Sequence, residues 1–422
     1  MIMTTLACIL SGLSLLMSVL LLINLNHPLG WIVIWPKLAA GALSPLWAVI
    51  GIAGAIVGWI YQALWVIPMG IVGAGIMIWY VWQCARDHNG FIQAFGAGWS
   101  DQILPQQTKK MVQRRWTLYL KLKTSPEISF ERDIAFWTVP DTQRELLCDI
   151  WQPADSNISG LAFIFFHGSA WAILDKDFGT RPFFCHIASQ GHTVMDVSYR
   201  LIPETNIYGM IGDVKRAIAW MKTNASRYGV DPGKIVLGGA SAGAHLALLA
   251  GYAPHHPELI PEDVKNADLS VCGVVSYYGP TDLLQGYDYY RVKKQSEKLP
   301  PVPIGQKLSS KERFKYSGRL DILLGGHLQD IPEIYQLACP ATHIHTGTPP
   351  TLLIQGNHDL LVPVNTTRAF YKKLLEAGVP AINVIYPLTE HIFDLVLPQL
   401  SPPAQSALYD VDRFLALLLN KN

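Results

Sequence analysis

Hydrophobic residues follow two different patterns along this chain, and the first fills residues 1–85. Residues 6–25 carry no charge, and a helix of that length, at about 1.5 Å per residue, crosses a hydrocarbon layer about 30 Å thick. Residues 38–85 are uncharged too. This segment is too long for one crossing and suits two helices with a turn near Gln62 and Pro68. The pattern predicts about three transmembrane helices, near 5–25, 41–60 and 65–83.

The second pattern begins after a polar connecting segment, residues 86–130. Short apolar runs of strand length alternate with stretches of helical spacing, of which 212–229 is the clearest. This alternation is typical of the α/β class, in which a mostly parallel sheet carries helices on both faces. We expect one such domain over 131–422. Its strand candidates are 146–153, 161–168, 192–201, 234–241, 269–279 and 350–359.

Charge divides the chain at the same place. Lys37 is the one charged side chain in residues 1–85, so 32 of the 33 Lys and Arg residues stand with the 32 Asp and Glu residues in the remainder. A soluble part without net charge lacks the concentrated basic surface that nucleic-acid binding requires. The six cysteines show no metal-ligand spacing, so we expect no metal site and interpret them as small buried residues.

The first apolar stretch is expected to be a membrane helix and not a cleaved signal peptide, because it lacks a positively charged start and a small-residue cleavage site. Aromatic residues gather near the predicted helix ends, as they do at membrane interfaces. They are Trp31, Trp35, Trp79, Tyr80 and Trp82.

The orientation follows from basic residues. With three helices, the loop carrying Lys37 and the basic segment from Arg86 to Arg115 lie on one side, which the positive-inside rule makes the cytoplasm. Sequons at Asn157, Asn224 and Asn365 favour the opposite arrangement, since they would be glycosylated in a secretory lumen. We expect a multi-pass integral membrane protein with a cytoplasmic soluble domain and leave the oligomeric state open.

Residues 239–243 read Gly-Ala-Ser-Ala-Gly at the junction of a strand and a helix. A nucleophile at such a turn needs small neighbours, and the helix N-terminus favours the negative charge that develops during attack. The same small residues also let a helix pack closely against a sheet. The motif alone therefore leaves two interpretations of Ser241.

Other strand candidates end in residues that would complete a hydrolytic site. Residues 163–171, FIFFHGSAW, end a strand at Gly168 and Ser169, whose amides could form an oxyanion hole with that of Ala242. Asp359 follows a later strand and His391 the one after it. Carboxyl ends of parallel strands meet at one edge of a sheet, so these residues are expected to come together.

These residues resemble the α/β-hydrolase family, in particular the hormone-sensitive-lipase-like esterases and the prenylcysteine methylesterases. The resemblance covers about residues 140–420 and includes VSYRLIPE, GASAGAHLA, YGPTDL, LLGG and HDLLVP. It implies that Ser241 is the nucleophile, that His391 is the general base and acid, and that Asp359 orients the histidine. No metal or organic cofactor is implied.

Ser169 departs from the family, which usually has a second glycine at this position. Serine would be strained there if the position requires a positive φ. His167 is expected to organise its loop, and His245 to be structural. Residues 285–337 are a possible cap insertion, in which Tyr287, Tyr289, Tyr290 and Phe314 either shape an acyl pocket or dock a helix.

The expected function is a membrane-anchored serine carboxylesterase that acts on a small-molecule or lipid-like ester. A lipase, thioesterase or amidase of the same fold is one alternative. The other is an inert hydrolase-like membrane binding protein, for which Ser169 leaves some room.

Overall fold

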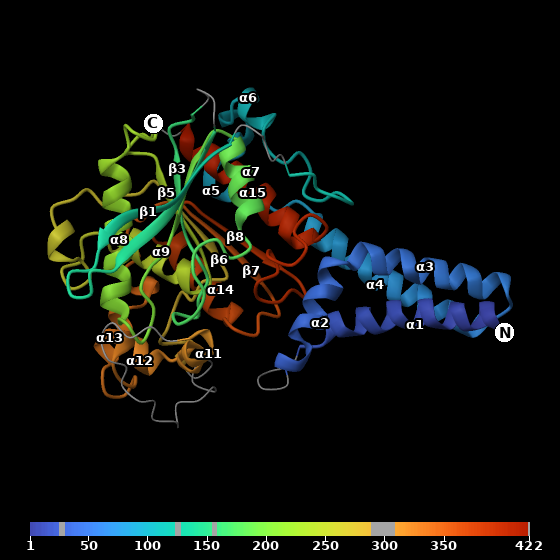
Figure 1. The fold of residues 1–422 in the computed structure, drawn as a ribbon. Coiled ribbons are helices and arrows are strands. Elements are labelled where there is room, and N and C mark those ends of the chain that lie inside the picture. The colour runs from blue at the N-terminus through green and yellow to red at the C-terminus, as the bar shows by residue number, and fades with distance from the viewer. Residues whose placement is uncertain (25–29, 123–127, 154–157, 288–308, 421–422) are drawn as a thin grey trace.

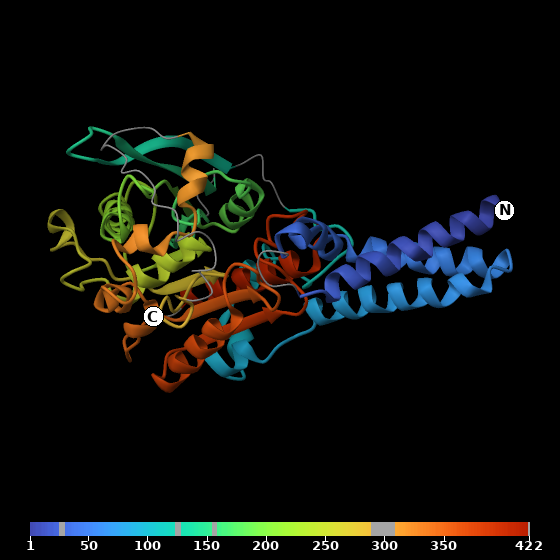
Figure 2. The ribbon, with the colours of Figure 1, turned by 90° about the horizontal axis from the view of Figure 1, so that it is seen from below.

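The computed structural model describes residues 1–24, 30–122, 128–153, 158–287 and 309–420. An α/β domain forms one end of the molecule and a bundle of apolar helices projects from it, with the N-terminus at the far end (Figures 1 and 2). Asn157, Tyr289, Tyr290 and much of the possible cap insertion lie outside the described residues.

The domain is built on one eight-stranded sheet in the order β1-β2-β4-β3-β5-β6-β7-β8. Strands β3 to β8 pair in parallel. At one edge, β1 pairs with β2 and β2 pairs with β4 in the antiparallel sense. The predicted α/β class and every predicted strand are therefore confirmed. The bounds are β1 (Ile128–Thr138), β2 (Glu145–Pro153), β3 (Ala162–Phe166), β4 (Thr193–Val197), β5 (Ile235–Ala240), β6 (Gly273–Tyr277), β7 (Thr351–Gly356) and β8 (Ala381–Tyr386).

Helices cover both faces because the central strands are apolar on both sides. Along β3, Phe163 and Phe165 pack on one face while Ile164 and Phe166 pack on the other. The first face is covered by α7 (Arg181–Ser189) and α15 (Pro402–Leu419). The second is covered by α8 (Ile207–Thr223), α9 (Ala242–Tyr252) and α14 (Val364–Glu376).

Helix α8 begins five residues before the predicted 212–229. The side chain of Asn206 caps it by accepting hydrogen bonds from the amides of Tyr208 and Gly209 at 3.1 and 3.3 Å. Smaller helices complete the domain. They are α5 (Gly90–Phe95), η2 (Trp99–Gln102) and α6 (Pro105–Thr108) in the connecting segment, η3 (Glu262–Val264), and α11 (Ser310–Arg313), η4 (Phe314–Tyr316), α12 (Leu320–Leu324), α13 (Pro332–Leu337) and η5 (Pro340–Thr342) before β7.

The apolar bundle consists of α1 (Ile2–Leu22), α2 (Gly30–Ala42), α3 (Ser44–Ile60), η1 (Leu64–Val66) and α4 (Ile67–Ala85). Small residues let its helices approach closely: a Cβ on Gly51 would lie 2.5 Å from Ser14 Oγ. Two helices, over residues 2–22 and 64–95, are long and apolar enough to cross a membrane. A third candidate is the pair 32–42 and 44–60, which is bent by 77°.

Two sequence expectations about this bundle are wrong. Lys37 lies inside α2 and is buried, so it is not a charge in an exposed loop. Tyr80 is 1% exposed and its hydroxyl lies 3.0 Å from Thr389 Oγ1, so it packs against the α/β domain and does not face a membrane interface. Both residues lie where the bundle meets the domain, which the local pattern of apolar residues could not reveal.

Candidate active site

Ser241 stands at a strained turn between β5 and α9. Its φ of 53° and ψ of −120° place a non-glycine residue in a left-handed conformation, a strain that typically marks functional sites. The Ser241 amide donates to the Tyr277 carbonyl at 2.9 Å and so ties the turn to β6. A Cβ on Gly243 would lie 2.1 Å from the carbonyl oxygen of Phe166, so this position requires glycine. The close packing of α9 against β3 and the strained turn that presents Ser241 are therefore two aspects of one local structure.

Asp359 and His391 meet near this turn: the centroid of the His391 ring lies 4.2 Å from that of Tyr278, the residue after Tyr277. His391 Nδ1 lies 2.9 Å from Asp359 Oδ2, and the other carboxylate oxygen accepts the amides of Leu361 and Val362 at 2.8 Å. Because the carboxylate can only accept, Nδ1 carries the proton and Nε2 keeps its lone pair. His391 Nε2 is buried and has no hydrogen-bond partner among the described residues, Ser241 included. The site thus holds an oriented imidazole with a free basic nitrogen.

The loop after β3 lies directly against the Ser241 turn. A Cβ on Gly168 would be 3.5 Å from Ser241 Cβ. Within the described part of the chain, the amides of Gly168 and Ser169 donate no backbone hydrogen bond. They are therefore available to an oxyanion, as is expected of the Ala242 amide at the first position of α9.

Ser169 is not strained. The positive φ angles of this loop fall on the next two residues, Ala170 at 45° and Trp171 at 59°. The Ser169 hydroxyl instead lies 2.8 Å from the Tyr199 hydroxyl and accepts the Trp171 amide at 3.0 Å. The side chain that replaces the family's usual glycine thus fixes the loop by two hydrogen bonds.

His167 and His245 support this loop. The His167 ring stacks on Tyr199 at a centroid distance of 4.5 Å. His245 Nδ1 accepts from Trp171 Nε1 at 3.3 Å, while its Nε2 donates to the Ala338 carbonyl at 2.8 Å. Burial lowers the pKa of both histidines to about 4, so both are neutral near pH 7. These contacts agree with the structural roles expected from the sequence.

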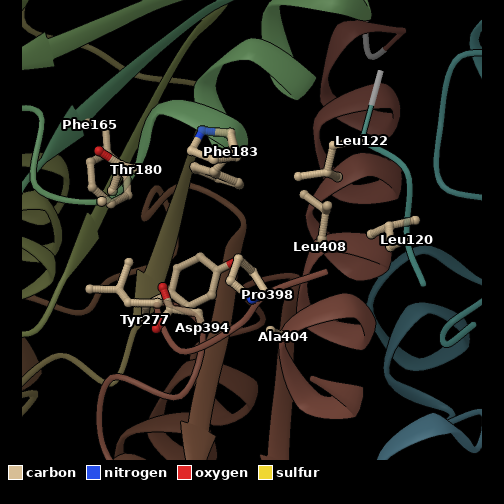
Figure 3. Close-up of a pocket in the computed structure, with 13 residues that line it drawn as sticks. Leu120, Leu122, Phe165, Thr180, Phe183, Tyr277, Asp394, Pro398, Ala404 and Leu408 are labelled. Carbon is tan, nitrogen blue, oxygen red and sulfur yellow. The ribbon is translucent and has the colours of Figure 1, made fainter. Parts of the chain in front are cut away.

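An apolar pocket opens on the α7 and α15 side of the sheet edge (Figure 3). Leu120 and Leu122 of the connecting segment and Leu408 of α15 line it opposite Tyr277 of β6. Its free volume is about 50 Å³. Asp394, three residues after His391, lies at its rim, and burial raises the pKa of this carboxyl to about 6. Tyr277 lines the pocket, and its backbone carbonyl accepts the Ser241 amide.

Lys37 forms an unexpected part of the site's surroundings. Its ammonium donates to Glu390 Oε1 at 2.8 Å and to the Ile23 carbonyl at 2.7 Å, and it lies 2.9 Å from His358 Nδ1. Glu390 Oε2 in turn accepts the amide of Leu360 at 3.0 Å. His358 and Leu360 flank Asp359, and Glu390 precedes His391, so one lysine of the apolar bundle holds both loops.

The sequence contained one signal for this lysine. A single charge within 85 apolar residues requires a partner, because an unpaired charge is costly in an apolar environment. The partner could not be identified from the sequence, since Glu390 lies 353 positions away. Burial raises the pKa of Glu390, although the Lys37 ammonium opposes this shift.

Comparison with known proteins identifies the family and the fold. The BD-FAE family model matches residues 148–374. The chain is 32% identical over 251 residues to a probable carboxylic ester hydrolase, LipM, of Mycobacterium tuberculosis, and 28% identical over 313 residues to esterase LipQ of the same organism. It is 26% identical over 267 residues to the isoprenylcysteine alpha-carbonyl methylesterase ICME of Arabidopsis thaliana.

These matches cover 59%, 73% and 62% of this chain and 53%, 69% and 57% of the respective relatives, so the chain spans about half to two thirds of their length. Solved structures share the fold. Esterase 2 of Thermogutta terrifontis with bound butyrate has a TM-score of 0.52 at 24% identity, covering 69% of this chain and 94% of its own. Esterase B of Lactobacillus Rhamnosis has a TM-score of 0.53 at 20% identity, with 71% and 88% covered.

Proposed function

The chain belongs to the BD-FAE family of hormone-sensitive-lipase-like α/β-hydrolases, and from this premise we propose that it is a membrane-anchored serine carboxylesterase. Ser241 is the proposed nucleophile, His391 the general base and acid, and Asp359 the carboxylate that orients it. The observation that carries the proposal is the 2.9 Å contact from Asp359 to His391 Nδ1, which leaves Nε2 unpaired near the strained serine turn.

In the proposed reaction, Ser241 Oγ forms a bond to the ester carbonyl carbon while His391 Nε2 takes the hydroxyl proton. The carbonyl oxygen becomes an oxyanion, which accepts hydrogen bonds from the amides of Gly168, Ser169 and Ala242. His391 then gives its proton to the leaving alcohol oxygen as the C–O bond breaks. Water repeats these steps on the acyl-enzyme, and the carboxylic acid and free Ser241 result.

The neutral histidines around the site favour this assignment of roles. His167 is held by stacking on Tyr199 and His245 by hydrogen bonds to Trp171 and Ala338, and burial lowers the pKa of both to about 4. A group with that pKa is a weak base at neutral pH. His391 is thus the histidine best placed to take a proton from Ser241.

Aromatic residues support anchoring in a membrane by residues 1–85. Trp79 and Trp82 are 43% and 57% exposed near the domain end of α4, and Trp59 and Trp65 are 66% and 64% exposed at its other end. From Trp65 to Trp82 a helix rises about 25 Å, close to the hydrocarbon thickness of a bilayer. The domain boundaries we propose are 1–85 for the anchor, 86–130 for the connecting segment and 131–422 for the hydrolase.

We still propose that the α/β domain lies in the cytoplasm, but the argument rests on fewer charges, because Lys37 is paired inside the protein. Arg86 at the end of α4 and Lys109, Lys110 and Arg114 in the connecting segment that follows carry the positive-inside argument. A reporter fused after Asn422 should be active in the cytoplasm. Activity on the opposite side only would reverse the proposed topology and leave the chemistry unchanged.

A fluorophosphonate probe and a series of p-nitrophenyl esters test the chemistry. Wild-type protein should be labelled, Ser241→Ala should not, and Ser226→Ala, an exposed serine, should behave as wild type. If the small apolar pocket lined by Tyr277 takes the acyl group, rates should fall from the butyrate toward long-chain esters. Equal labelling of Ser241→Ala would refute the nucleophile. Faster hydrolysis of matched thioesters or amides would favour those alternatives.

A further inference from the structure

A polar cavity of about 500 Å³ lies between the domain end of α4 and the outer strand β8. Its wall combines residues of the apolar bundle with residues of β8, α14 and α15. It shares no lining residue with the apolar pocket near Tyr277 and plays no part in the proposed ester hydrolysis. Below it is called the junction cavity.

The junction cavity carries uncompensated positive charge. Arg115 is neutralised by Asp410 at 2.9 Å and Asp87 at 3.0 Å. Arg86 and Arg368 also line the cavity, and neither forms an ion pair with any residue the structure describes. Two guanidinium groups without carboxylate partners therefore face the same space, which suits an anion with several oxygen atoms.

The partners of these two arginines are neutral. Arg368 donates to the side-chain oxygens of Asn357 and Asn365 at 2.7 and 3.2 Å, and Arg86 lies over the Trp82 ring at 5.7 Å. His88 contributes to the wall, with Nε2 3.1 Å from Asp410. The acidic groups here, Asp87 and Asp410, are thus already engaged and do not balance Arg86 and Arg368.

One polar atom in the same wall lacks a partner. The Asn383 side-chain carbonyl oxygen is buried without a hydrogen-bond partner among the described residues, whereas the Tyr386 hydroxyl interacts with the Ser406 side chain of the same wall. Buried polar groups are normally paired, so such an atom indicates a missing ligand or water. The carbonyl oxygen can accept from an alcohol or ammonium group on such a ligand.

The cavity also lies at the level where lipid headgroups are expected. Trp79 lines it and Trp82 lies one turn further along α4, both exposed. Exposed tryptophans next to arginines mark the interface between hydrocarbon and headgroups. We propose that the junction cavity binds the phosphodiester headgroup of a membrane phospholipid, with Arg86 and Arg368 on the phosphate. This proposal rests on the membrane anchoring proposed above.

The test uses the full chain purified in a neutral detergent. Phosphatidylglycerol, diacylglycerol and inorganic phosphate are titrated in separate experiments. The unfolding temperature is measured at each concentration. Phosphatidylglycerol should raise the unfolding temperature, whereas diacylglycerol and inorganic phosphate at equal concentration should not. In Arg86→Gln/Arg368→Gln the apparent affinity should fall about tenfold or more, since each arginine contributes roughly one charge-assisted contact.

Arg132→Gln/Arg227→Gln is the matched control, because both arginines are exposed on the opposite part of the domain; it should bind as wild type. Unchanged affinity in Arg86→Gln/Arg368→Gln would overturn the site, and a full shift with inorganic phosphate alone would overturn the lipid as its source. Fluorophosphonate labelling and resistance to alkaline extraction from membranes are measured in parallel. If wild-type protein is not labelled, or is extracted from membranes at alkaline pH, the proposed function is refuted. The lipid selectivity of the junction cavity is judged separately from the unfolding temperatures.

Discussion

Lys37 Nζ lies 2.8 Å from Glu390 Oε1, and both side chains are buried, at 1% and 6% exposure. The pair joins α2 of the apolar bundle to the residue before His391. Glu390 also accepts the amide of Leu360, the residue after Asp359. The proposed acid and base loops are therefore fixed to each other and to the bundle through one carboxylate.

Lys37→Met is expected to reduce kcat by about 10- to 100-fold with a smaller change in KM, because a shift of about 1 Å in His391 or Asp359 costs this much. Removing one partner of a buried ion pair also costs about 3–5 kcal/mol of stability. Rates of p-nitrophenyl butyrate hydrolysis, corrected for folded fraction, measure the first effect. Thermal unfolding measures the second.

Lys37→Met/Glu390→Gln separates charge burial from positioning. It removes both charges, so it should recover much of the stability while kcat stays low. The matched control is Lys372→Met/Glu376→Gln, an exposed pair at 3.6 Å on α14, which should leave both quantities unchanged. Full recovery of kcat in the buried double variant would show that Lys37 does not position the loops.

Asp359→Asn tests the orientation of His391. Asparagine can donate to Nδ1 and so stabilise the tautomer that carries its proton on Nε2, which cannot take the Ser241 proton. We expect kcat to fall by about four orders of magnitude. Asp101→Asn, at an exposed position of η2, is the control and should keep wild-type kcat. A fall below tenfold in Asp359→Asn would mean that another group orients the base.

Ser241, Asp359 and His391 could be proposed from the sequence because each follows a strand whose apolar run is readable locally. A parallel sheet then brings strand ends to one edge whatever the distance along the chain. The structure places Asp359 and His391 in contact after β7 and β8, and Ser241 after β5, which is separated from β7 by β6 alone. Whether all three act together remains the prediction tested above.

The supporting contacts could not be predicted in the same way. Lys37 with Glu390, and Trp171 with His245, join residues on separate elements whose docking no periodic pattern encodes. Ser169 illustrates the limit differently. The family's glycine suggested a positive φ at this position, but the structure places positive φ at Ala170 and Trp171. Backbone angles of an irregular loop depend on its tertiary contacts, which the sequence does not display.

Ser169→Ala tests the hydroxyl in the oxyanion loop. Its loss leaves the Trp171 amide without its partner and removes one of the two hydrogen bonds of the Tyr199 hydroxyl, which still donates to the His167 carbonyl; this should cost about 1–3 kcal/mol of stability. Since the Ser169 amide remains, kcat should fall less than the 10²- to 10³-fold typical of a lost oxyanion donor. Thermal unfolding and ester hydrolysis measure the two effects. Wild-type stability would show that water replaces the hydroxyl.

Asp196 should make stability depend on pH. It lies on β4 opposite Asp149 of β2 and accepts the Asp177 amide at 2.6 Å, while its Oδ1 has no partner among the described residues. Burial raises the pKa of Asp196 to about 8. An unfolded aspartate has a pKa of about 3.9. Between about pH 4 and pH 8 the folded state therefore binds the extra proton, and the free energy of unfolding falls as pH rises.

Asp196→Asn mimics the protonated carboxyl and cannot titrate. The variant should match wild type near pH 4 and become increasingly the more stable of the two as pH rises toward 8, because only the wild type must then ionise a buried group or unfold. Unfolding temperatures of both proteins at pH 4, 6 and 8 measure the difference. Asp101→Asn should stay parallel to wild type. If the stability of Asp196→Asn also runs parallel to wild type, Asp196 is ionised in the folded state over the whole pH range. Lys176, paired with Asp149 at 2.7 Å, is then the cation that stabilises it.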